Sequence, residues 1–271
     1  MYVGSDLQPH QAAARPRNSE ATMQPSNPIY PAFKRTLDVL LAFMIGVFAL
    51  PVIVVMAIAV KLTSRGPFIY TQRRSGFDGR EFVIYKVRTM YEDAERRGGA
   101  QWATEHDPRI TPIGRFLRKS HLDEFPQLWN ILRGEMSLVG PRPERPEFIV
   151  QLEVAIPHYR ERLNVRPGVT GLAQIQLPAD VDLISVRRKL SCDLFYIERL
   201  GAWMDFKILL VTGLSLVGLR YPTGCRIFRV PDQDDIESKC KVVKVLRRQT
   251  AYDHEKPSQF ESTAAHMDPV Y

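Results

Sequence analysis

The chain has 271 residues, 45% of them hydrophobic and 25% charged, which suits one sizeable core with flexible ends rather than two clear domains. Its formal charge is +7, and residues 61–120 hold thirteen Lys or Arg against seven Asp or Glu, so we expect anionic partners such as phosphate esters, acidic lipid headgroups or nucleic acid. The three cysteines form no CxxC pair, which argues against a disulfide framework and a zinc ribbon. The six histidines include no HExxH pattern, so a local zinc site is not expected, and a hard cation on oxygen ligands stays open.

The N-terminal part divides into a leader and an apolar segment. Residues 1–30 are rich in Gln, Pro, Ala, Ser and Asn and have no apolar periodicity, so we expect a disordered leader. Residues 39–60 then run for 22 positions without a charge, and about 20 residues are enough to cross a bilayer as a helix. We therefore predict a membrane anchor over residues 31–62.

Two forms of this anchor stay open, a re-entrant helix and a spanning one. Lys34 and Arg35 precede it while Lys61 and Arg65 follow it, so the positive-inside rule is nearly balanced. Pro51, near the middle, removes a backbone donor and clashes with the preceding turn, which predicts a kink there. A sharp kink could return both ends to the cytoplasmic face, so we favour re-entry, with a kinked spanning helix as the alternative.

A β-hairpin is predicted after the anchor. The segment FIYTQ is followed by the turn-forming SGFDG at residues 75–79 and by REFVIYKVRT, which is rich in β-branched and aromatic residues. Lys86 and Arg88 are two residues apart, a spacing that puts both cations on one face of a strand, where they could meet one anion. A solvated basic strand edge is the alternative explanation.

Two helical pieces come next, IGRFLRKS and DEFPQLWNIL, which meet at residues 121–123. Asp123 stands at an N-cap type position, Pro126 falls in the first turn, and Gly134 ends the second piece. We therefore expect a helix N-terminus beside Asp123. A rigid turn in MSLVGPRPERP, a Gly-rich loop in PGVTGLAQI and a polar helix over residues 182–200 are predicted to follow.

The adjacent carboxylates Asp123 and Glu124 are the sharpest chemical feature of the sequence. Helix capping and the helix dipole explain an isolated Asp-Glu pair. Here the pair lies between the basic LRKSH segment and the later Arg133 and Arg142. One carboxylate can attack phosphorus while its neighbour holds Mg²⁺, which also binds the phosphates of a substrate. We therefore expect one site that needs both residues.

Arg142 is the third candidate site residue. It stands between two prolines in a PRP tripeptide, so its backbone is nearly fixed. A fixed guanidinium suits bidentate contact with a phosphate or a diphosphate. A surface turn with a salt bridge is the alternative.

Three blocks of the chain resemble the signature blocks of the bacterial sugar transferase family, the small monotopic polyprenyl-phosphate phosphoglycosyl transferases. They are FVIYKVRTM, DPRITPIGRFLRKSHLDEFPQLWNILRGEMSLVGPRP and RPGVTGLAQI. The resemblance runs from about Lys34 to Gly218, and KRTLD with the apolar stretch behind it is similar to the family's re-entrant membrane helix. Phe125 is a departure, because the family usually has Leu at this position of its DELPQ motif.

The resemblance implies a two-step reaction on a UDP-sugar. Asp123, which matches the family's nucleophile, attacks the phosphate that carries the sugar, releases UMP and becomes an aspartyl phosphosugar. A polyprenyl (undecaprenyl) phosphate then attacks that intermediate and becomes a polyprenyl diphosphate sugar. Glu124 matches the Mg²⁺-binding partner, and the equivalent of Arg142 contacts nucleotide phosphate. Lys86 and Arg88 match a basic strand motif, which we expect to neutralise lipid or nucleotide phosphate.

The resemblance also implies a location and a biological role. The stretch LPADVDLISVRRKL looks most like the short members that begin exopolysaccharide repeat units with glucose or galactose, and the choice of hexose stays open. The implied place is the bacterial cytoplasmic membrane, with the catalytic domain on its cytoplasmic face, where basic residues attract anionic lipid. The expected partners are a UDP-hexose, a polyprenyl phosphate and the membrane, without nucleic acid, and a homo-oligomer stays open.

The predicted fold class is α+β, with a mostly helical catalytic domain, a small strand element and an N-terminal re-entrant membrane helix. The predicted division is a leader at 1–30, the anchor at 31–62, the catalytic domain at 63–229 and a polar tail at 230–271. Two other classes compete. A membrane-tethered binding protein for nucleic acid or acidic lipid would not need Asp123, and the chain lacks a helix-turn-helix, RRM or KH signature. A structural scaffold would not turn over substrate.

Overall fold

The computed structural model describes residues 29–92, 94, 107–178 and 182–239. Nearly all of the predicted leader and the greater part of the predicted tail therefore lie outside the described residues. The first ten residues of that tail are described, although we assigned them no fold from the sequence. In the structure Val230 and Ile236 are buried in the main core, so the packed body continues beyond residue 229.

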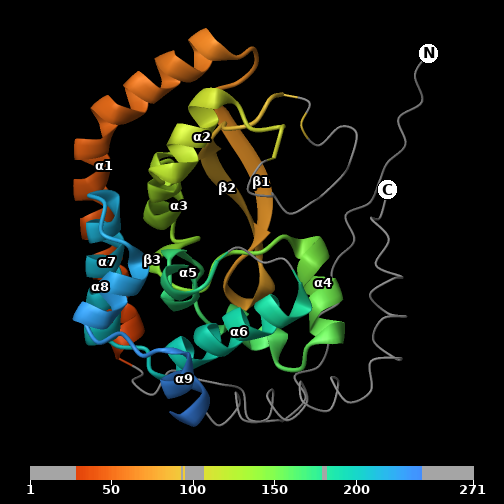
Figure 1. Cartoon of the computed structure of the whole chain (residues 1–271), viewed down its shortest axis with the longest axis vertical. Coiled ribbons are helices and arrows are strands. Elements are labelled where there is room, and N and C mark those ends of the chain that lie inside the picture. Colours follow the sequence, from red (N-terminus) through yellow and green to blue (C-terminus); the bar gives the residue numbers. More distant parts are fainter. Residues whose placement is uncertain (1–28, 93, 95–106, 179–181, 240–271) are drawn as a thin grey trace.

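Helices dominate the described chain and two small two-stranded sheets accompany them, which confirms the predicted α+β class with a mostly helical body (Figure 1). The helices are α1 (Tyr30–Thr63), α2 (Pro112–Lys119), α3 (Gln127–Arg133), α4 (Pro146–Ala155), α5 (Leu172–Gln176), α6 (Leu183–Glu198), α7 (Ala202–Leu216), α8 (Tyr221–Ile227) and α9 (Gln233–Lys239), with 3₁₀ turns η1 (Phe77–Gly79), η2 (Leu122–Glu124) and η3 (Tyr159–Asn164). The strands are β1 (Ile69–Ser75), β2 (Glu81–Val87), β3 (Ser137–Val139) and β4 (Gly168–Thr170).

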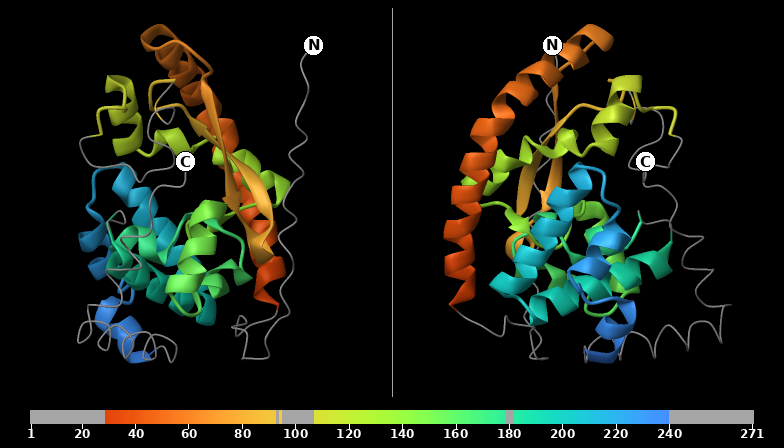
Figure 2. Two further views of the ribbon diagram at one scale, coloured as in Figure 1. Left: turned by 90° about the vertical axis from the view of Figure 1, so that its right-hand side faces the viewer. Right: turned by 60° about the vertical axis from the view of Figure 1, so that its left-hand side comes forward.

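Helix α1 contains the predicted anchor. It is 34 residues long, has Pro51 in its interior, and is long and apolar enough to cross a membrane by length and composition. Figures 1 and 2 show that it continues through the proline and bends along its length, as expected where proline removes a hydrogen bond. Large apolar side chains such as Phe43, Phe48 and Leu50 are exposed along it. A surface of this kind fits lipid rather than water.

The predicted hairpin is confirmed. Strands β1 and β2 pair antiparallel, with Tyr70 opposite Lys86, and the turn between them places Asp78 and Gly79 in the left-handed region. Asp tolerates that conformation and Gly adopts it freely, which explains why SGFDG reverses the chain here. Helix α3 packs against both α1 and β2, so the hairpin is held beside α1 through α3 (Figure 1).

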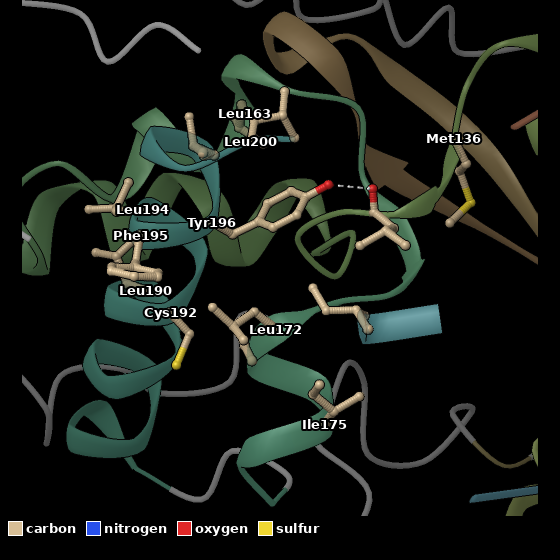
Figure 3. Packing of buried hydrophobic residues seen from close by; sticks show 14 of the residues in the cluster. Met136, Leu163, Leu172, Ile175, Leu190, Cys192, Leu194, Phe195, Tyr196 and Leu200 are labelled. Carbon is tan, nitrogen blue, oxygen red and sulfur yellow. Dashed lines mark hydrogen bonds between the residues drawn. The ribbon is translucent and has the colours of Figure 1, made fainter. Parts of the chain in front are cut away.

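The main core lies between α5, α6 and the parallel pair β3–β4. Figure 3 shows side chains of α6 packed around Leu172 and Ile175 of α5. Tyr196 of α6 is fully buried, and its hydroxyl proton is shared between the carbonyl oxygen of Val139 at 3.1 Å (Figure 3) and Oδ1 of Asp205 at 2.7 Å. Since Val139 ends β3 just before the PRP turn, the contact with Val139 ties the start of that turn to the core.

A buried polar network ties the start of α1 to the body. The Asp205 carboxylate of α7 accepts from the hydroxyl of Tyr30, from the ammonium of Lys34 at 2.6 Å and from the hydroxyl of Tyr196. One turn along α1, Asp38 accepts from the Ser137 hydroxyl over 2.7 Å and from the backbone of β3. Buried charges persist only when they are paired and hydrogen-bonded in this way. The KRTLD segment therefore anchors α1 to the body.

Candidate active site

The backbone between α2 and α3 presents the two adjacent carboxylates. His121 takes a left-handed conformation, with φ 55°, and thereby ends the path of α2. Helical backbone resumes at Leu122 in η2 and leads into α3, whose N-cap position is held by Pro126 without a side-chain bond. The prediction that Asp123 caps this helix is wrong, because its side chain makes no capping hydrogen bond. The predicted stop at Gly134, which is left-handed, is confirmed.

Glu124 is held by two cations from distant parts of the chain. Lys86 of β2 donates to its Oε1 over 2.7 Å, and Arg142 reaches the same oxygen from the PRP turn at 3.3 Å. Burial raises the pKa of Glu124, but Lys86 and Arg142 outweigh that effect and bring the pKa down to about 2. Glu124 is therefore ionised at any physiological pH. The structure thus brings together three of the predicted site residues.

Asp123 occupies a different environment from its neighbour. Asp123 is only 8% exposed, and its carboxylate has no hydrogen bond to any described residue. Burial and the charge of Glu124 raise its pKa, against the attraction of Lys86, Arg118 and Arg142. The result is a carboxylate with unengaged lone pairs in a region of positive charge. Such a group can act as a nucleophile toward an anionic phosphorus centre.

Arg88 contacts a different part of the structure from Lys86. Its guanidinium donates to the carbonyl oxygen of Ser64 over 3.1 Å and to the Ser64 hydroxyl, where α1 ends. A Cβ added at Gly66, whose φ is +104°, would lie 2.1 Å from Nη1 of Arg88, so glycine is required for this approach. Arg88 thus links the strand to the end of α1, and its contact with phosphate stays a prediction.

Two arginines that were not among the predicted site residues hold the PRP turn, the buried Arg162 and the half-buried Arg74. Nη2 of Arg162 in η3 donates to the carbonyl oxygen of Arg142 over 3.0 Å, and the same nitrogen forms an ion pair with Asp193 of α6 at 2.8 Å. Arg74 of β1 donates to the carbonyl oxygen of Pro143 over 3.4 Å. Since these contacts span 20 and 69 residues, no local pattern could have identified them.

Arg118 is a further cation near the carboxylates. It lies on α2, where Nε donates to the Thr89 hydroxyl over 2.8 Å, and its positive charge lowers the pKa of Asp123 against the larger effect of burial. The LRKSH segment before Asp123 was a usable signal for it, because an arginine five residues upstream and one helical piece away remains close after the reversal at His121. The site therefore contains a cation that was not among the predicted site residues.

The residues fit a divalent cation only in part. No group of three or more His, Cys, Asp and Glu side chains that could hold a metal occurs among the described residues. Mg²⁺, however, is commonly bound through one or two carboxylates with water and substrate phosphates completing its shell. Glu124 is ionised and Asp123 has unengaged oxygens, so these two residues could hold Mg²⁺ together with a phosphate ligand.

Comparison with known proteins places the chain among sugar transferases. Residues 29–218 match the family described as bacterial sugar transferase. A UDP-glucose:undecaprenyl-phosphate glucose-1-phosphate transferase of Caulobacter vibrioides is 38% identical over 217 residues, which cover 78% of this chain and 81% of that protein. An exopolysaccharide production protein of Rhizobium leguminosarum is 35% identical over 67% of this chain and 94% of its own length.

A third relative is longer than this chain. It is a UDP-N-acetylgalactosamine-undecaprenyl-phosphate N-acetylgalactosaminephosphotransferase of Aeromonas hydrophila, 40% identical over 195 residues, which cover 72% of this chain. The match spans only 46% of that protein, so the chain corresponds to about half of its length.

Proposed function

This chain belongs to the bacterial sugar transferase family, and from that premise we propose that it transfers a hexose-1-phosphate from a UDP-sugar to a polyprenyl phosphate. The names of its relatives contain glucose and N-acetylgalactosamine as sugars and undecaprenyl phosphate as acceptor. Glucose and galactose are the hexoses that we predicted from the sequence, and N-acetylgalactosamine joins them as a candidate.

The observation that carries the proposal is the contrast between two neighbouring carboxylates. Glu124 is engaged by Lys86 and Arg142, whereas Asp123 is buried, has no hydrogen bond to a described residue, and lies in the field of three cations. A nucleophile needs free lone pairs, and an anionic diphosphate needs positive charge to approach a carboxylate. Asp123 has both properties.

The proposed reaction has two displacements at the same phosphorus. In the first, an oxygen of Asp123 forms a bond to the sugar-bearing phosphorus, the bond to the bridging oxygen breaks, and UMP leaves with the electron pair. The product on the protein is an aspartyl phosphosugar. In the second, an oxygen of the lipid phosphate attacks that phosphorus and the Asp123 carboxylate leaves, so that the enzyme is regenerated and the lipid carries a diphosphate sugar.

The surrounding cations have roles that follow from their positions. Arg142 is 49% exposed and its backbone is held by prolines and Arg162, so it can bind the nucleotide diphosphate from a fixed position. Lys86 is mostly buried against Glu124 and supplies positive charge without leaving its strand. Mg²⁺, when bound at Glu124, supplies further neutralisation of phosphate charge.

The membrane helix gives the reaction its location. We expect α1 to enter the cytoplasmic membrane and return at its bend, which leaves the body on the cytoplasmic face, where a soluble UDP-sugar and a lipid phosphate can reach Asp123 in turn. The exposed apolar surface of α1 supports lipid contact, and the similarity to an exopolysaccharide production protein supports a role at the start of exopolysaccharide repeat-unit synthesis. Labelling of an N-terminal cysteine from each side of the membrane tests re-entry, because periplasmic access would contradict it.

The test of the reaction is UMP release in nanodiscs with Mg²⁺ and undecaprenyl phosphate, run with UDP-glucose, UDP-galactose and UDP-N-acetylgalactosamine. Asp123→Asn should release no UMP, whereas Asp78→Asn, at an exposed hairpin turn, should match the wild type. Without lipid acceptor, a sugar-labelled substrate should mark the wild-type protein once and leave Asp123→Asn unmarked. Equal UMP release by the wild type and Asp123→Asn would contradict the assignment of Asp123 as the nucleophile. If the wild type releases no UMP from any UDP-sugar, a structural scaffold is favoured instead.

A further inference from the structure

Gln127, the first residue of α3, has a buried side chain whose amide nitrogen lacks a partner. The residue is 2% exposed, and its Nε2 has no hydrogen-bond acceptor among the described residues. A buried donor without an acceptor costs free energy, so such groups in native proteins call for an explanation. A ligand that brings an acceptor is one explanation, and the position of Gln127 in the chain favours it.

Gln127 lies four residues after Asp123 and three after Glu124. Phe125 (φ −54°, ψ −36°) and Pro126 (φ −61°, ψ −18°) both have helical backbone and join η2 to α3. The backbone bonds across this junction have 3₁₀ spacing, as from Phe125 N to the Leu122 carbonyl oxygen, and residues three apart then share a face. Gln127 therefore stands on the face of Glu124, next in sequence to Asp123.

The two side chains do not satisfy each other. Asp123 makes no hydrogen bond to a described residue, and Nε2 of Gln127 makes none either. Two buried polar groups of complementary type thus lie four residues apart without forming a bond. An acceptor bound at Asp123 would bring an oxygen to the amide, which the protein itself does not provide.

We propose that the Gln127 amide donates a hydrogen bond to a non-bridging oxygen of the phosphoryl group that Asp123 receives. The inference rests on the proposed function and adds a residue that contacts the reacting group. A neutral donor suits this position, because it stabilises charge on the phosphoryl oxygens without forming an ion pair that would occupy the Asp123 carboxylate. The contact would be strongest in the transition state and in the aspartyl phosphosugar.

The test compares Gln127→Met, which keeps the length of the side chain and removes the donor, with Gln127→Glu, which keeps its shape and adds a negative charge. Gln174→Met is the matched control, because Gln174 Nε2 donates to the Val169 carbonyl oxygen over 2.8 Å within the fold. Each variant is measured for UMP release with UDP-glucose in nanodiscs, for single-turnover labelling of the protein without lipid acceptor, and for thermal unfolding.

Gln127→Met is expected to slow single-turnover labelling about 100-fold, the usual effect of removing one transition-state donor, while its unfolding temperature equals or exceeds that of the wild type. Gln127→Glu should be slower still, because a further anion beside Asp123 and Glu124 repels the diphosphate. Gln174→Met should show the reverse pattern, with a lower unfolding temperature and labelling near the wild-type rate.

Two results would overturn the inference. Labelling of Gln127→Met at the wild-type rate would show that the amide does not contact the phosphoryl group. A fall in unfolding temperature large enough to account for the lost activity would show that Gln127 serves the fold alone. Both results require an active wild type, so they are distinct from failure of the proposed function, in which the wild type itself releases no UMP and acquires no label.

Discussion

Replacing Glu124 with Gln is expected to lower the free energy of unfolding by about 3 kcal/mol at neutral pH, at about 1.4 kcal/mol per pKa unit. The magnitude follows from its pKa, which burial would raise but Lys86 and Arg142 lower from 4.5 to about 2. A depressed pKa means that the stabilisation is complete above pH 4.5 and is lost as the pH falls toward 2. The difference between wild type and Glu124→Gln should therefore shrink over that interval.

Replacing Asp123 with Asn should instead raise the free energy of unfolding. Burial and the charge of Glu124 raise the pKa of Asp123, so the folded protein binds this proton more tightly than the unfolded chain does. Ionised Asp123 is consequently unfavourable for stability above its raised pKa, and this penalty disappears below the pKa of an unfolded aspartate. Asp123→Asn should therefore unfold at a higher temperature than the wild type at neutral pH, although it cannot form the intermediate.

Thermal unfolding in detergent, followed by the fluorescence of the three tryptophans, distinguishes the two effects. Asp78→Asn, at an exposed turn, should shift stability by less than about 0.5 kcal/mol and serves as the control. If Asp123→Asn and Glu124→Gln shift the unfolding temperature in the same direction, the electrostatic assignment is refuted. If the loss of stability in Glu124→Gln stays constant from neutral pH to pH 3, the effect comes from packing rather than from charge.

Four other outcomes are expected. The rate of UMP release should fall as the pH is lowered, because Asp123 must be ionised to attack. Since the pKa of Asp123 is raised, this fall should begin at a higher pH than for an exposed aspartate, and a pH profile of kcat/KM measures it. Asp205→Asn removes the nearer anion of the buried Lys34 and leaves only Asp38 at 3.7 Å, so it should cost about 3 kcal/mol, measured by thermal unfolding, and speed proteolysis near the start of α1. Arg162→Lys should raise KM for the UDP-sugar about tenfold with little change in kcat, because a charge-assisted bond to the Arg142 carbonyl is weakened. Chelation of divalent cations should abolish UMP release and added Mg²⁺ should restore it.

The elements that the sequence predicted are those whose signals are local. The hairpin follows from β-branched residues on both sides of SGFDG, and the end of α3 follows from Gly134, which the structure places in the left-handed region. The long apolar helix follows from 22 uncharged residues. Each of these depends on residues within a few turns of one another.

The local reasoning failed where helical backbone began earlier than the capping pattern indicated. Asp123 looked like an N-cap, but the chain is already helical at Leu122, so its carboxylate is not used by the backbone. The partner of Glu124 was also beyond local reasoning, because Lys86 is 38 residues away and reaches it only after the hairpin packs on α3. Arg162 lies 20 residues from the carbonyl that it binds.

The short 3₁₀ turn explains how two adjacent carboxylates acquire different properties. Consecutive side chains on a 3₁₀ turn diverge by about 120°, since it has three residues per turn. Glu124 can therefore face Lys86 on β2 while Asp123 faces a different direction, without a hydrogen bond to a described residue. If the cations bound Asp123 directly, its lone pairs would be occupied and its pKa lowered, and both effects would weaken it as a nucleophile. Because Lys86 and Arg142 bind Glu124 instead, their positive charge stays close enough to attract a diphosphate, and the attacking oxygen of Asp123 remains free.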